Sequence, residues 1–195
     1  MRLEDALLQV VLDVDAFPDQ EAAAWCESVI AGGADIVRVR PRELARSALE
    51  AMRDICRRED ALLVMENDAA CAAGLGADGV HLSGPSESVG EARATAGDKC
   101  ILGISSTTLD EARLALELGV DYLVHEAGAE SGIAAAALRG IACVPIFAGR
   151  IRALADARAV TGSGLLRLAV DASAMGRENV TAQVAEFARI MGRCI

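Results

Sequence analysis

Polar side chains able to move protons or bind cations stand directly behind short apolar runs of this chain. Three such places carry Glu66-Asn67-Asp68, His81 and His125-Glu126. Carboxylates and imidazoles are the usual general acids and bases near neutral pH, and together with carboxamides they also bind divalent metal ions. The sequence therefore predicts a site for acid/base chemistry or for a metal ion, provided that the fold brings these segments together.

The elements that must position these groups alternate regularly along the chain. Short β-branched or apolar runs predict strands at Leu8 to Leu12, Ile36 to Arg40, Leu62 to Glu66, Gly79 to Leu82, Cys100 to Ile104, Tyr122 to His125, Cys143 to Phe147 and Leu165 to Val170. Amphipathic stretches predict helices at Asp19 to Ala31, Glu43 to Arg57, Asp68 to Leu75, Ser86 to Thr95, Thr108 to Leu118, Gly132 to Leu138, Ile151 to Val160 and Val180 to Gly192. This alternation is typical of repeated βα units on a parallel sheet.

Eight such units predict an α/β fold, a single TIM (β/α)8 barrel domain over residues 1–195. The barrel should be compact with short loops, because 195 residues is near the lower limit for this fold. A doubly wound open sheet is the alternative, but it usually has a glycine-rich loop after its first strand, and here that strand runs into Asp13 to Pro18. In a barrel the polar segments would meet at the carboxyl ends of the strands.

The acidic composition excludes several classes of partner. The chain has 29 acidic and 19 basic residues, a net charge of −10, and 3% aromatic residues. Such a field repels nucleic-acid backbones and anionic membranes, and few aromatic rings are available to stack on bases. No apolar run reaches the roughly 18 residues of a membrane span, and the acidic start lacks a signal-peptide pattern, so we expect a cytoplasmic protein. A lysine Schiff base is excluded because the single lysine, Lys99, precedes a predicted strand, at the end opposite to the rim.

Several blocks of the sequence also follow one another in the order seen in a known family. They are Gly33 to Arg42, the Asn67-Asp68 region, Gly76 to Gly84, Leu102 to Ser105, Glu111 to Tyr122, and Val144 to Gly149. In their order and approximate spacing they resemble the thiamine phosphate synthases and the related thiazole tautomerases, over roughly residues 8 to 175. The resemblance implies a TIM barrel of thiamine biosynthesis that binds thiazole phosphate. The synthases join that compound to a pyrimidine diphosphate with the help of Mg²⁺ and release pyrophosphate.

The resemblance further implies which residues bind the substrate. Arg40 corresponds to a strand-two arginine of the family, Arg42 to a lysine that contacts the diphosphate, and Arg38 to a glutamine. Ser105 corresponds to a serine that contacts the pyrimidine diphosphate. Further substrate-binding residues are expected at Asn67, His81, Gly149 and Arg150. Structural alternatives stay open: the arginines could pair with acidic neighbours, Ser105 could cap a helix, and His81 could bond to neighbouring loops.

The metal site of the family is only partly matched. Asp68 is the candidate Mg²⁺ ligand, but an alignment without a gap places Glu66 and Asn67 on the family's Asn-Asp pair instead. The family's second aspartate ligand falls in the stretch 83–86, which contains no acid. We therefore expect at most a weakened Mg²⁺ site.

The loop after the sixth predicted strand departs further from the synthases. They carry a threonine-rich turn and a lysine here, whereas this chain has His125-Glu126 and neither lysine nor threonine as far as Gly132. Each lost charge-assisted contact costs about 1.5–3 kcal/mol, so losing two or three lowers affinity or rate on the order of 10³-fold. The tautomerases place a catalytic histidine in this loop, about two positions later. We therefore expect His125 to be an acid/base catalyst that Glu126 orients.

Three functions follow from these observations. The first is a divergent member of this family with doubtful synthase activity, a transferase or isomerase acting on a small phosphorylated heterocycle. The second is a metal-assisted epimerase or lyase of a small sugar phosphate, with His81, His125 and an acid as ligands. The third is a barrel that binds a ligand without turnover. We expect no nucleic acid or membrane partner, and consider a homodimer as the assembly.

Overall fold

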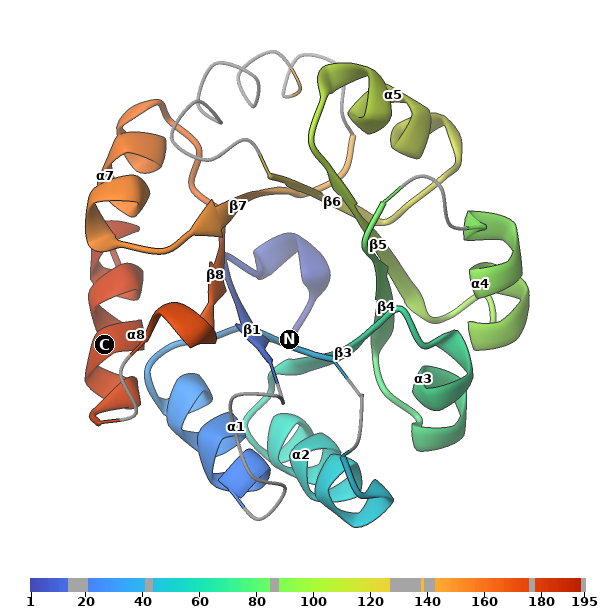
Figure 1. Cartoon of the computed structure of the whole chain (residues 1–195), viewed down its shortest axis with the longest axis horizontal. Coiled ribbons are helices and arrows are strands. Elements are labelled where there is room, and N and C mark those ends of the chain that lie inside the picture. Colours follow the sequence, from blue (N-terminus) through green and yellow to red (C-terminus); the bar gives the residue numbers. More distant parts are fainter. Residues whose placement is uncertain are drawn as a thin grey trace.

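The computed structural model describes residues 1–13, 21–40, 44–84, 88–126, 138, 143–175 and 178–193. Eight parallel strands close into a barrel in the order of the sequence (Figure 1), which confirms the predicted fold. The strands are β1 (Leu8–Leu12), β2 (Ile36–Val39), β3 (Leu62–Glu66), β4 (Gly79–Leu82), β5 (Ile101–Ser106), β6 (Tyr122–His125), β7 (Ile146–Ile151) and β8 (Leu168–Asp171). The helices are α1 (Ala22–Ala31), α2 (Arg46–Arg58), α3 (Ala69–Leu75), α4 (Val89–Ala96), α5 (Leu109–Glu117), α7 (Leu154–Gly162) and α8 (Val180–Ile190), with short 3-10 helices η1 (Leu3–Asp5) and η5 (Ala172–Ala174).

Two strands begin three residues later than predicted, β7 at Ile146 rather than Cys143 and β8 at Leu168 rather than Leu165. In β7 the reason is Pro145, which has no N–H for the ladder and only accepts a hydrogen bond from the Leu123 backbone N–H at 3.0 Å. The strand then continues through an irregularity, because pairing with β8 shifts between Ala148 and Ile151. The helix expected over Gly132 to Leu138 lies outside the described residues, apart from Leu138 itself.

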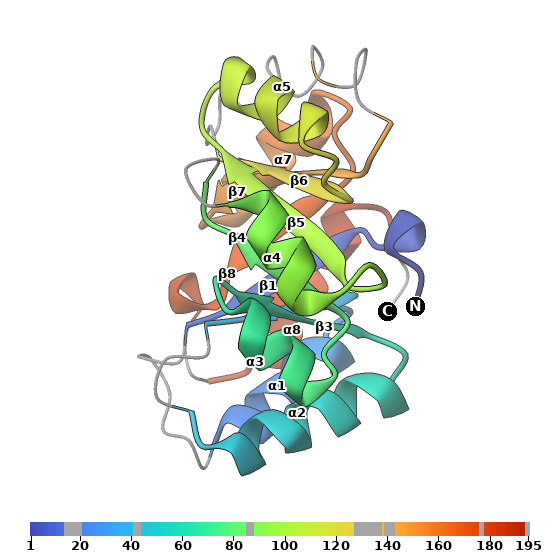
Figure 2. The same ribbon diagram turned by 90° about the vertical axis from the view of Figure 1, so that its right-hand side faces the viewer.

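The strands bury both of their faces, as a parallel barrel requires. Inward side chains form a cluster that includes Ile36, Val64, Tyr122, Val124 and Phe147. The alternate, outward side chains join the helices in a second and larger cluster. Figure 2 shows α3, α4 and α5 lying against the outside of the strands.

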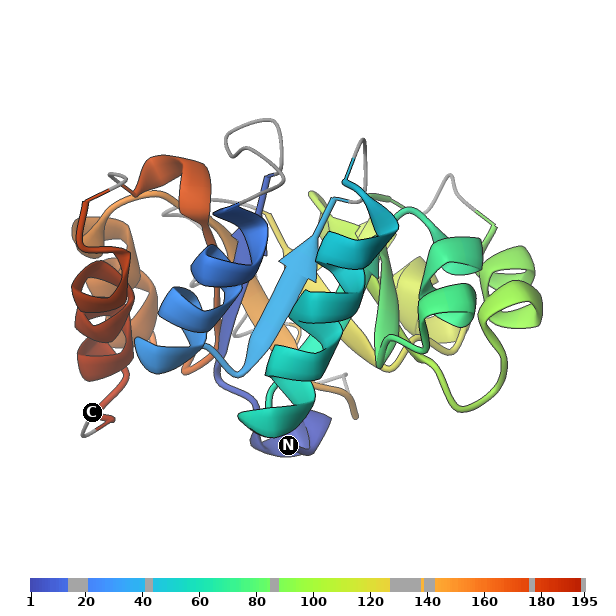
Figure 3. The same ribbon diagram turned by 90° about the horizontal axis from the view of Figure 1, so that it is seen from below.

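One end of the barrel is closed by the start of the chain. Met1 and Leu3 pack against the inward cluster, and the Arg167 guanidinium donates to the backbone carbonyls of Ala6 at 3.1 Å and Glu4 at 2.7 Å. Figure 3 shows η1 at this end, while β2 points away from it. The open mouth is therefore at the carboxyl ends of the strands. Within the described residues, no helix is both long and apolar enough to cross a membrane.

An aspartate before each of three even-numbered strands fixes the register of the barrel. The Asp35 carboxylate accepts the Leu8 backbone N–H at 2.9 Å, while Asp78 and Asp121 bind the backbone N–H groups of Leu63 at 2.8 Å and Leu102 at 2.7 Å. Each aspartate thereby ties its own strand to the preceding one. The recurring Gly-x-Asp triplets in the sequence are braces of the fold, placed at the closed end and not at the mouth.

Candidate functional site

Toward the mouth, the lining of the barrel changes from apolar to polar. Because side chains alternate along a strand, the inward positions beyond the apolar cluster belong to Asp13, Arg38, Arg40, Glu66, His81, Ser105, Glu126 and Asp171. They come from seven strands and the residues directly behind them. The structure thus brings most of the predicted polar residues to one place.

Glu66 lies between two arginines of the neighbouring segment, Arg38 in β2 and Arg40 directly after it. Its Oε1 accepts a hydrogen bond from Arg40 Nε at 2.9 Å, and its Oε2 lies 3.2 Å from Arg38 Nε. Asp13 adds a second carboxylate, 2.8 Å from Arg40 Nη1. Burial works against the charge on Arg40, but the hydrogen bond and charge of Glu66, with Asp13 and Asp171, raise its pKa above the ordinary value. Arg40 is therefore a permanent cation at the mouth.

Arg38 is less well satisfied than Arg40. Its side chain is only 6% exposed, and its contact with Glu66 has ion-pair distance but not the geometry of a hydrogen bond. Among the described residues, Arg38 Nε and Nη1 and Glu66 Oε2 have no hydrogen-bond partner. Buried donors of this kind are costly unless something binds them. Arg38 is therefore suited to bind an anionic group that enters the mouth.

A second group of polar side chains crosses the interior from β1 to the end of β6. Tyr122 Oη lies 3.3 Å from Gln9 Nε2 and 3.0 Å from His81 Nδ1. His81 Nε2 lies 2.9 Å from Ser105 Oγ, and Ser105 donates to Glu126 Oε1 at 2.9 Å. Burial, followed by the positive charges of Arg38 and Arg40, lowers the pKa of His81 well below its ordinary value. His81 is therefore neutral and bonded through both ring nitrogens.

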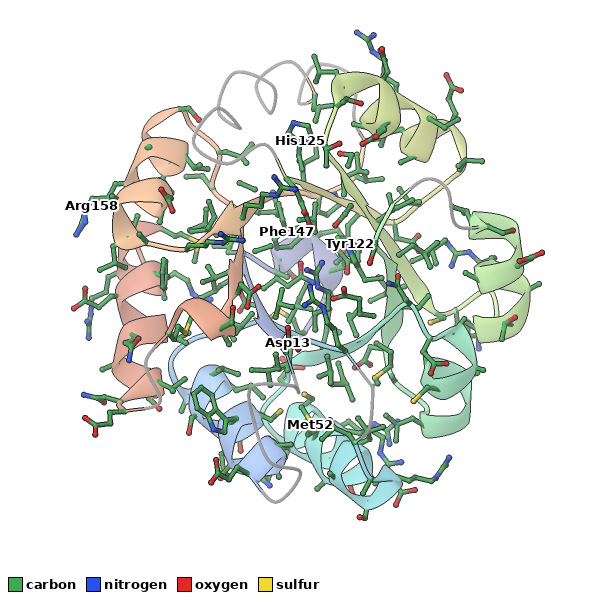
Figure 4. All side chains as sticks on the ribbon, in the orientation of Figure 1. Asp13, Met52, Tyr122, His125, Phe147 and Arg158 are labelled. Carbon is green, nitrogen blue, oxygen red and sulfur yellow. The ribbon has the colours of Figure 1, made fainter. Side chains whose placement is uncertain are left out.

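His125 lies on the opposite face of β6 from these groups. Figure 4 shows it on the outer side of the ring, whereas Tyr122 and Phe147 point inward. Its Nδ1 is 3.0 Å from the hydroxyl of Ser106, and its side chain is 1% exposed. Burial lowers its pKa, although the nearby charges of Glu111 and Glu126 oppose this shift. The structure therefore does not bring His125 together with the inward group, and its expected role as the acid/base catalyst has no support from this placement.

The three residues Glu66, Asn67 and Asp68 at the end of β3 have three different roles. Glu66 points into the barrel, as described above. Asn67 has a left-handed backbone with φ of 55°, and its amide exchanges hydrogen bonds with Ser83 at 2.6 and 2.8 Å. Asp68 caps α3, because its Oδ1 accepts the Cys71 backbone N–H at 2.7 Å. Of these three residues, only Glu66 therefore contributes a carboxylate to the mouth.

The expected Mg²⁺ site does not fit this arrangement. In the part of the chain that is described, no group of three histidine, cysteine, aspartate or glutamate side chains could hold a metal ion. Asp68 already serves as a helix cap, and Glu66 is engaged with two arginines. Mg²⁺ is usually held by one or two carboxylates together with water and substrate phosphates, and both candidate carboxylates of this motif already have other partners. We therefore assign no chemical step to a metal ion.

Gly149 and Arg150 form the irregular part of β7 beside Glu126. A Cβ on Gly149 would lie 2.8 Å from Val124 Cγ1 and 2.9 Å from Glu126 Cγ, so only glycine fits. Arg150 has φ of 55°, is 57% exposed, and brings its Nε to 3.5 Å from Glu126 Oε2. The predicted pair thus lies at the mouth, next to Glu126. Arg42 falls outside the described residues.

Sequence reasoning did not single out two residues that the site contains, Gln9 and Tyr122. Both looked like ordinary strand residues. One feature of the sequence could have revealed Tyr122: Gly103 stands in the middle of an apolar strand, where a glycine marks a close approach of another group. A Cβ there would lie 2.0 Å from Tyr122 Cζ, so the tyrosine ring occupies that space.

Comparison with known proteins extends these observations. The chain matches over residues 8–131 the model of a family described as thiamine monophosphate synthase. A thiamine-phosphate synthase of Methylobacillus flagellatus is 34% identical over 177 residues, which cover 78% of this chain and 83% of the relative. Another, of Thioalkalivibrio sulfidiphilus, is 35% identical over 133 residues, which cover 66% of this chain and 62% of the relative. In this second match the chain spans less than two thirds of the relative's length.

Solved structures of other proteins share the fold. A thiamine phosphate pyrophosphorylase from Pyrococcus furiosus matches with a TM-score of 0.82 at 24% identity and covers 96% of both chains. The 2-keto-3-deoxy-6-phospho-gluconate aldolase of Zymomonas mobilis matches with a TM-score of 0.71 at 18% identity, covering 95% of this chain and 93% of the aldolase. These two likenesses concern the barrel alone. The family model and the M. flagellatus relative cover most of the sequence itself, and the chain therefore belongs to the thiamine monophosphate synthase family.

Proposed function

We propose that this chain binds a small phosphorylated heterocycle, such as thiazole phosphate, in the mouth of the barrel. The observation that carries this proposal is Arg38, a buried guanidinium whose Nε and Nη1 have no hydrogen-bond partner among the described residues. Arg40 lies beside it and is 39% exposed, so a ligand can reach it from solvent. Guanidinium groups match phosphate oxygens in charge and in their forked geometry. The names of the relatives support the same class of ligand.

The charges of the mouth favour a phosphate monoester over a diphosphate. Among the described residues, three arginines, at 38, 40 and 150, face four carboxylates, at 13, 66, 126 and 171. A diphosphate brings more negative charge into this acidic surrounding than a monoester does, and the described residues include no group of three possible metal ligands that would hold an offsetting ion. Doubtful synthase activity therefore remains part of the proposal.

Glu126 is the proposed proton acceptor of the site. Its carboxylate accepts a hydrogen bond from Ser105 and also lies beside the guanidinium of Arg150. A carboxylate held at the mouth can take a proton from a bound heterocycle, which is the step an isomerase of this family would need. His125 would have to act from behind the strand, so we place the acid/base role on Glu126 alone.

One alternative keeps specific support, namely a barrel that binds the ligand without turnover. The part of the chain that is described contains no group of three possible metal ligands, and this favours binding without the metal-assisted chemistry of a synthase. The geometry argues against a metal-assisted epimerase, since His81 and His125 lie on opposite faces of the barrel wall and cannot bind one ion together. A cytoplasmic location and a homodimer stay predictions from the sequence.

Calorimetric titration with thiazole phosphate tests the proposal. Arg40→Ala should weaken binding about tenfold or more, because one charge-assisted contact is lost. Arg58→Ala, which removes an exposed arginine of α2 that pairs with Glu27 and Glu59, is the matched control and should leave the affinity unchanged. Absence of binding to the unaltered chain would refute the proposal, and equal affinity of the two variants would place the ligand away from Arg40. Product analysis with thiazole phosphate, with and without pyrimidine diphosphate and Mg²⁺, then separates turnover from binding alone.

A further inference from the structure

We propose that Tyr122 and His81 are positioning residues, which hold the Ser105 hydroxyl as a hydrogen-bond donor to Glu126 through a chain of bonds that runs in one direction only. This hydrogen-bond chain begins at Gln9 on β1 and ends at Glu126 behind β6. None of its members before Glu126 needs to touch the ligand. Their effect would reach the ligand through the orientation of one carboxylate.

The carboxylate of Glu126 sets the direction of the hydrogen bonds. An ionised glutamate can only accept, so the Ser105 O–H points to Glu126 Oε1, at 2.9 Å. The Ser105 oxygen must then accept from its other neighbour, His81 Nε2, also at 2.9 Å. A neutral imidazole carries one proton, and here that proton is on Nε2.

The remaining bonds follow from this tautomer. His81 Nδ1 carries no proton and accepts from the Tyr122 O–H at 3.0 Å. The Tyr122 oxygen is then free to accept, and the Gln9 amide donates to it at 3.3 Å. His81 and Tyr122 both keep the protonation state that these bonds need. Burial keeps the His81 imidazole neutral, and it raises the pKa of Tyr122 to about 12, so the hydroxyl keeps its proton. Successive bonds in one direction polarise and strengthen one another.

The packing around Tyr122 leaves it no other position. Its side chain is fully buried, and its ring fills the space above Gly103, which has no Cβ. The Phe147 ring meets it edge-on at 5.8 Å between centroids, and the His81 ring lies 5.5 Å away. The hydroxyl is therefore held at His81 by apolar contacts that do not depend on the hydrogen bonds themselves.

For catalysis, the consequence is a fixed Glu126. Oε1 is bound by Ser105, while Oε2 faces Arg150 at 3.5 Å. A base held in one orientation transfers protons more effectively than one that must be ordered in each cycle. This part of the inference rests on the proposed function, in which Glu126 takes a proton from the ligand.

The direction of the chain can be tested on the protein without any ligand, by long-range ¹H–¹⁵N NMR with ¹⁵N-labelled histidine. The sequence has only two histidines, so assignment needs few variants. We expect a His81 signal of the Nε2–H tautomer in the unaltered protein, and a changed ¹⁵N chemical shift of Nδ1 in Tyr122→Phe, because that nitrogen loses its hydrogen-bond donor. The matched control is Ser106→Ala, which removes the equivalent bond to His125 on the outer face and should change the His125 signal alone. A proton on His81 Nδ1, or a His81 signal that Tyr122→Phe leaves unchanged, would overturn the proposal.

Turnover gives an independent second measurement. If thiazole phosphate is converted, Tyr122→Phe should lower kcat about tenfold and leave KM within about twofold. Arg40→Ala should instead raise KM, since it acts on binding. A Tyr122→Phe variant that keeps full kcat would overturn the positioning role. If the unaltered protein shows no turnover, the proposed acid/base function fails, while the NMR experiment still decides the direction of the chain.

Discussion

His81 and His125 lie on opposite faces of the barrel wall, and each is bonded to one of two successive serines of β5. Ser105 meets His81 inside the barrel, at 2.9 Å, and Ser106 meets His125 between the sheet and the helices, at 3.0 Å. Both imidazoles are buried, and burial lowers the pKa of each. The folded protein therefore holds both histidines uncharged, in two unrelated surroundings.

This predicts that stability falls when the pH is lowered from about 7.5 to about 5.5. The unfolded chain binds a proton at each histidine below about pH 6.5, whereas the folded chain does not until its lower pKa values are reached. The stabilisation is complete above about pH 6.5 and is lost as the pH falls toward those values. Urea unfolding should show a slope of up to about 1.4 kcal/mol per pH unit for each histidine. His125→Gln should reduce this slope by about half, and a flat profile in the unaltered protein would contradict the prediction.

A second prediction concerns the space that Tyr122 occupies. Gly103→Ala should destabilise the protein by about 3 kcal/mol or more, because the new Cβ would meet the tyrosine ring at 2.0 Å inside a closed barrel. Gly90→Ala is the control: that glycine occupies an exposed position of α4 with nothing within 4 Å, and alanine there should stabilise by about 0.5–1 kcal/mol. Urea unfolding of both variants checks this. Equal stability of the two would mean that Tyr122 can leave its place at little cost.

The barrel itself could be predicted from the sequence, because eight apolar runs alternate with amphipathic stretches and each Gly-x-Asp triplet marks a return to the sheet. The boundaries of β7 could not, since Pro145 and the bulge before Ile151 act through pairing with neighbouring strands. These are tertiary effects, and a periodic pattern does not contain them.

The candidate site was only partly accessible from the sequence. That Arg40, His81 and Ser105 meet at one rim follows from their places at strand ends. Which face each side chain takes depends on the strand register, and for His125 one residue decides between the mouth and the helix layer. Glu66 and Asp68 would share a face in a longer strand, but β3 ends at Glu66, and Asp68 caps α3 instead of pointing inward.

A third prediction separates helix capping from metal binding at Asp68. Asparagine is as good an N-cap as aspartate, so Asp68→Asn should leave the free energy of unfolding nearly unchanged, whereas Asp68→Ala should cost about 1 kcal/mol. Thiazole phosphate titrations with and without Mg²⁺ should give the same affinity for Asp68→Asn as for the unaltered chain. Loss of a Mg²⁺ effect in the stable Asp68→Asn variant would restore Asp68 as a metal ligand.

A fourth prediction concerns Glu66, which shares the two arginines that a phosphate would use. Glu66→Gln keeps the size of the side chain but removes its charge, and leaves the buried Arg38 without a counterion. Losing one member of a buried ion pair costs about 3 kcal/mol or more, so the variant should unfold at lower urea concentration. Its affinity for inorganic phosphate should rise about tenfold, because the anion no longer competes with a carboxylate.

Calorimetry with inorganic phosphate measures this exchange directly, and the same ligand should raise the stability of Glu66→Gln more than that of the unaltered chain. Glu50→Gln is the control, since Glu50 pairs with Arg46 on the exposed face of α2 and should affect neither quantity. Weaker phosphate binding in Glu66→Gln would show the opposite relation, in which Glu66 holds Arg38 and Arg40 in the geometry that the ligand requires. The sign of this one change therefore distinguishes a carboxylate that competes with the ligand from one that prepares its site.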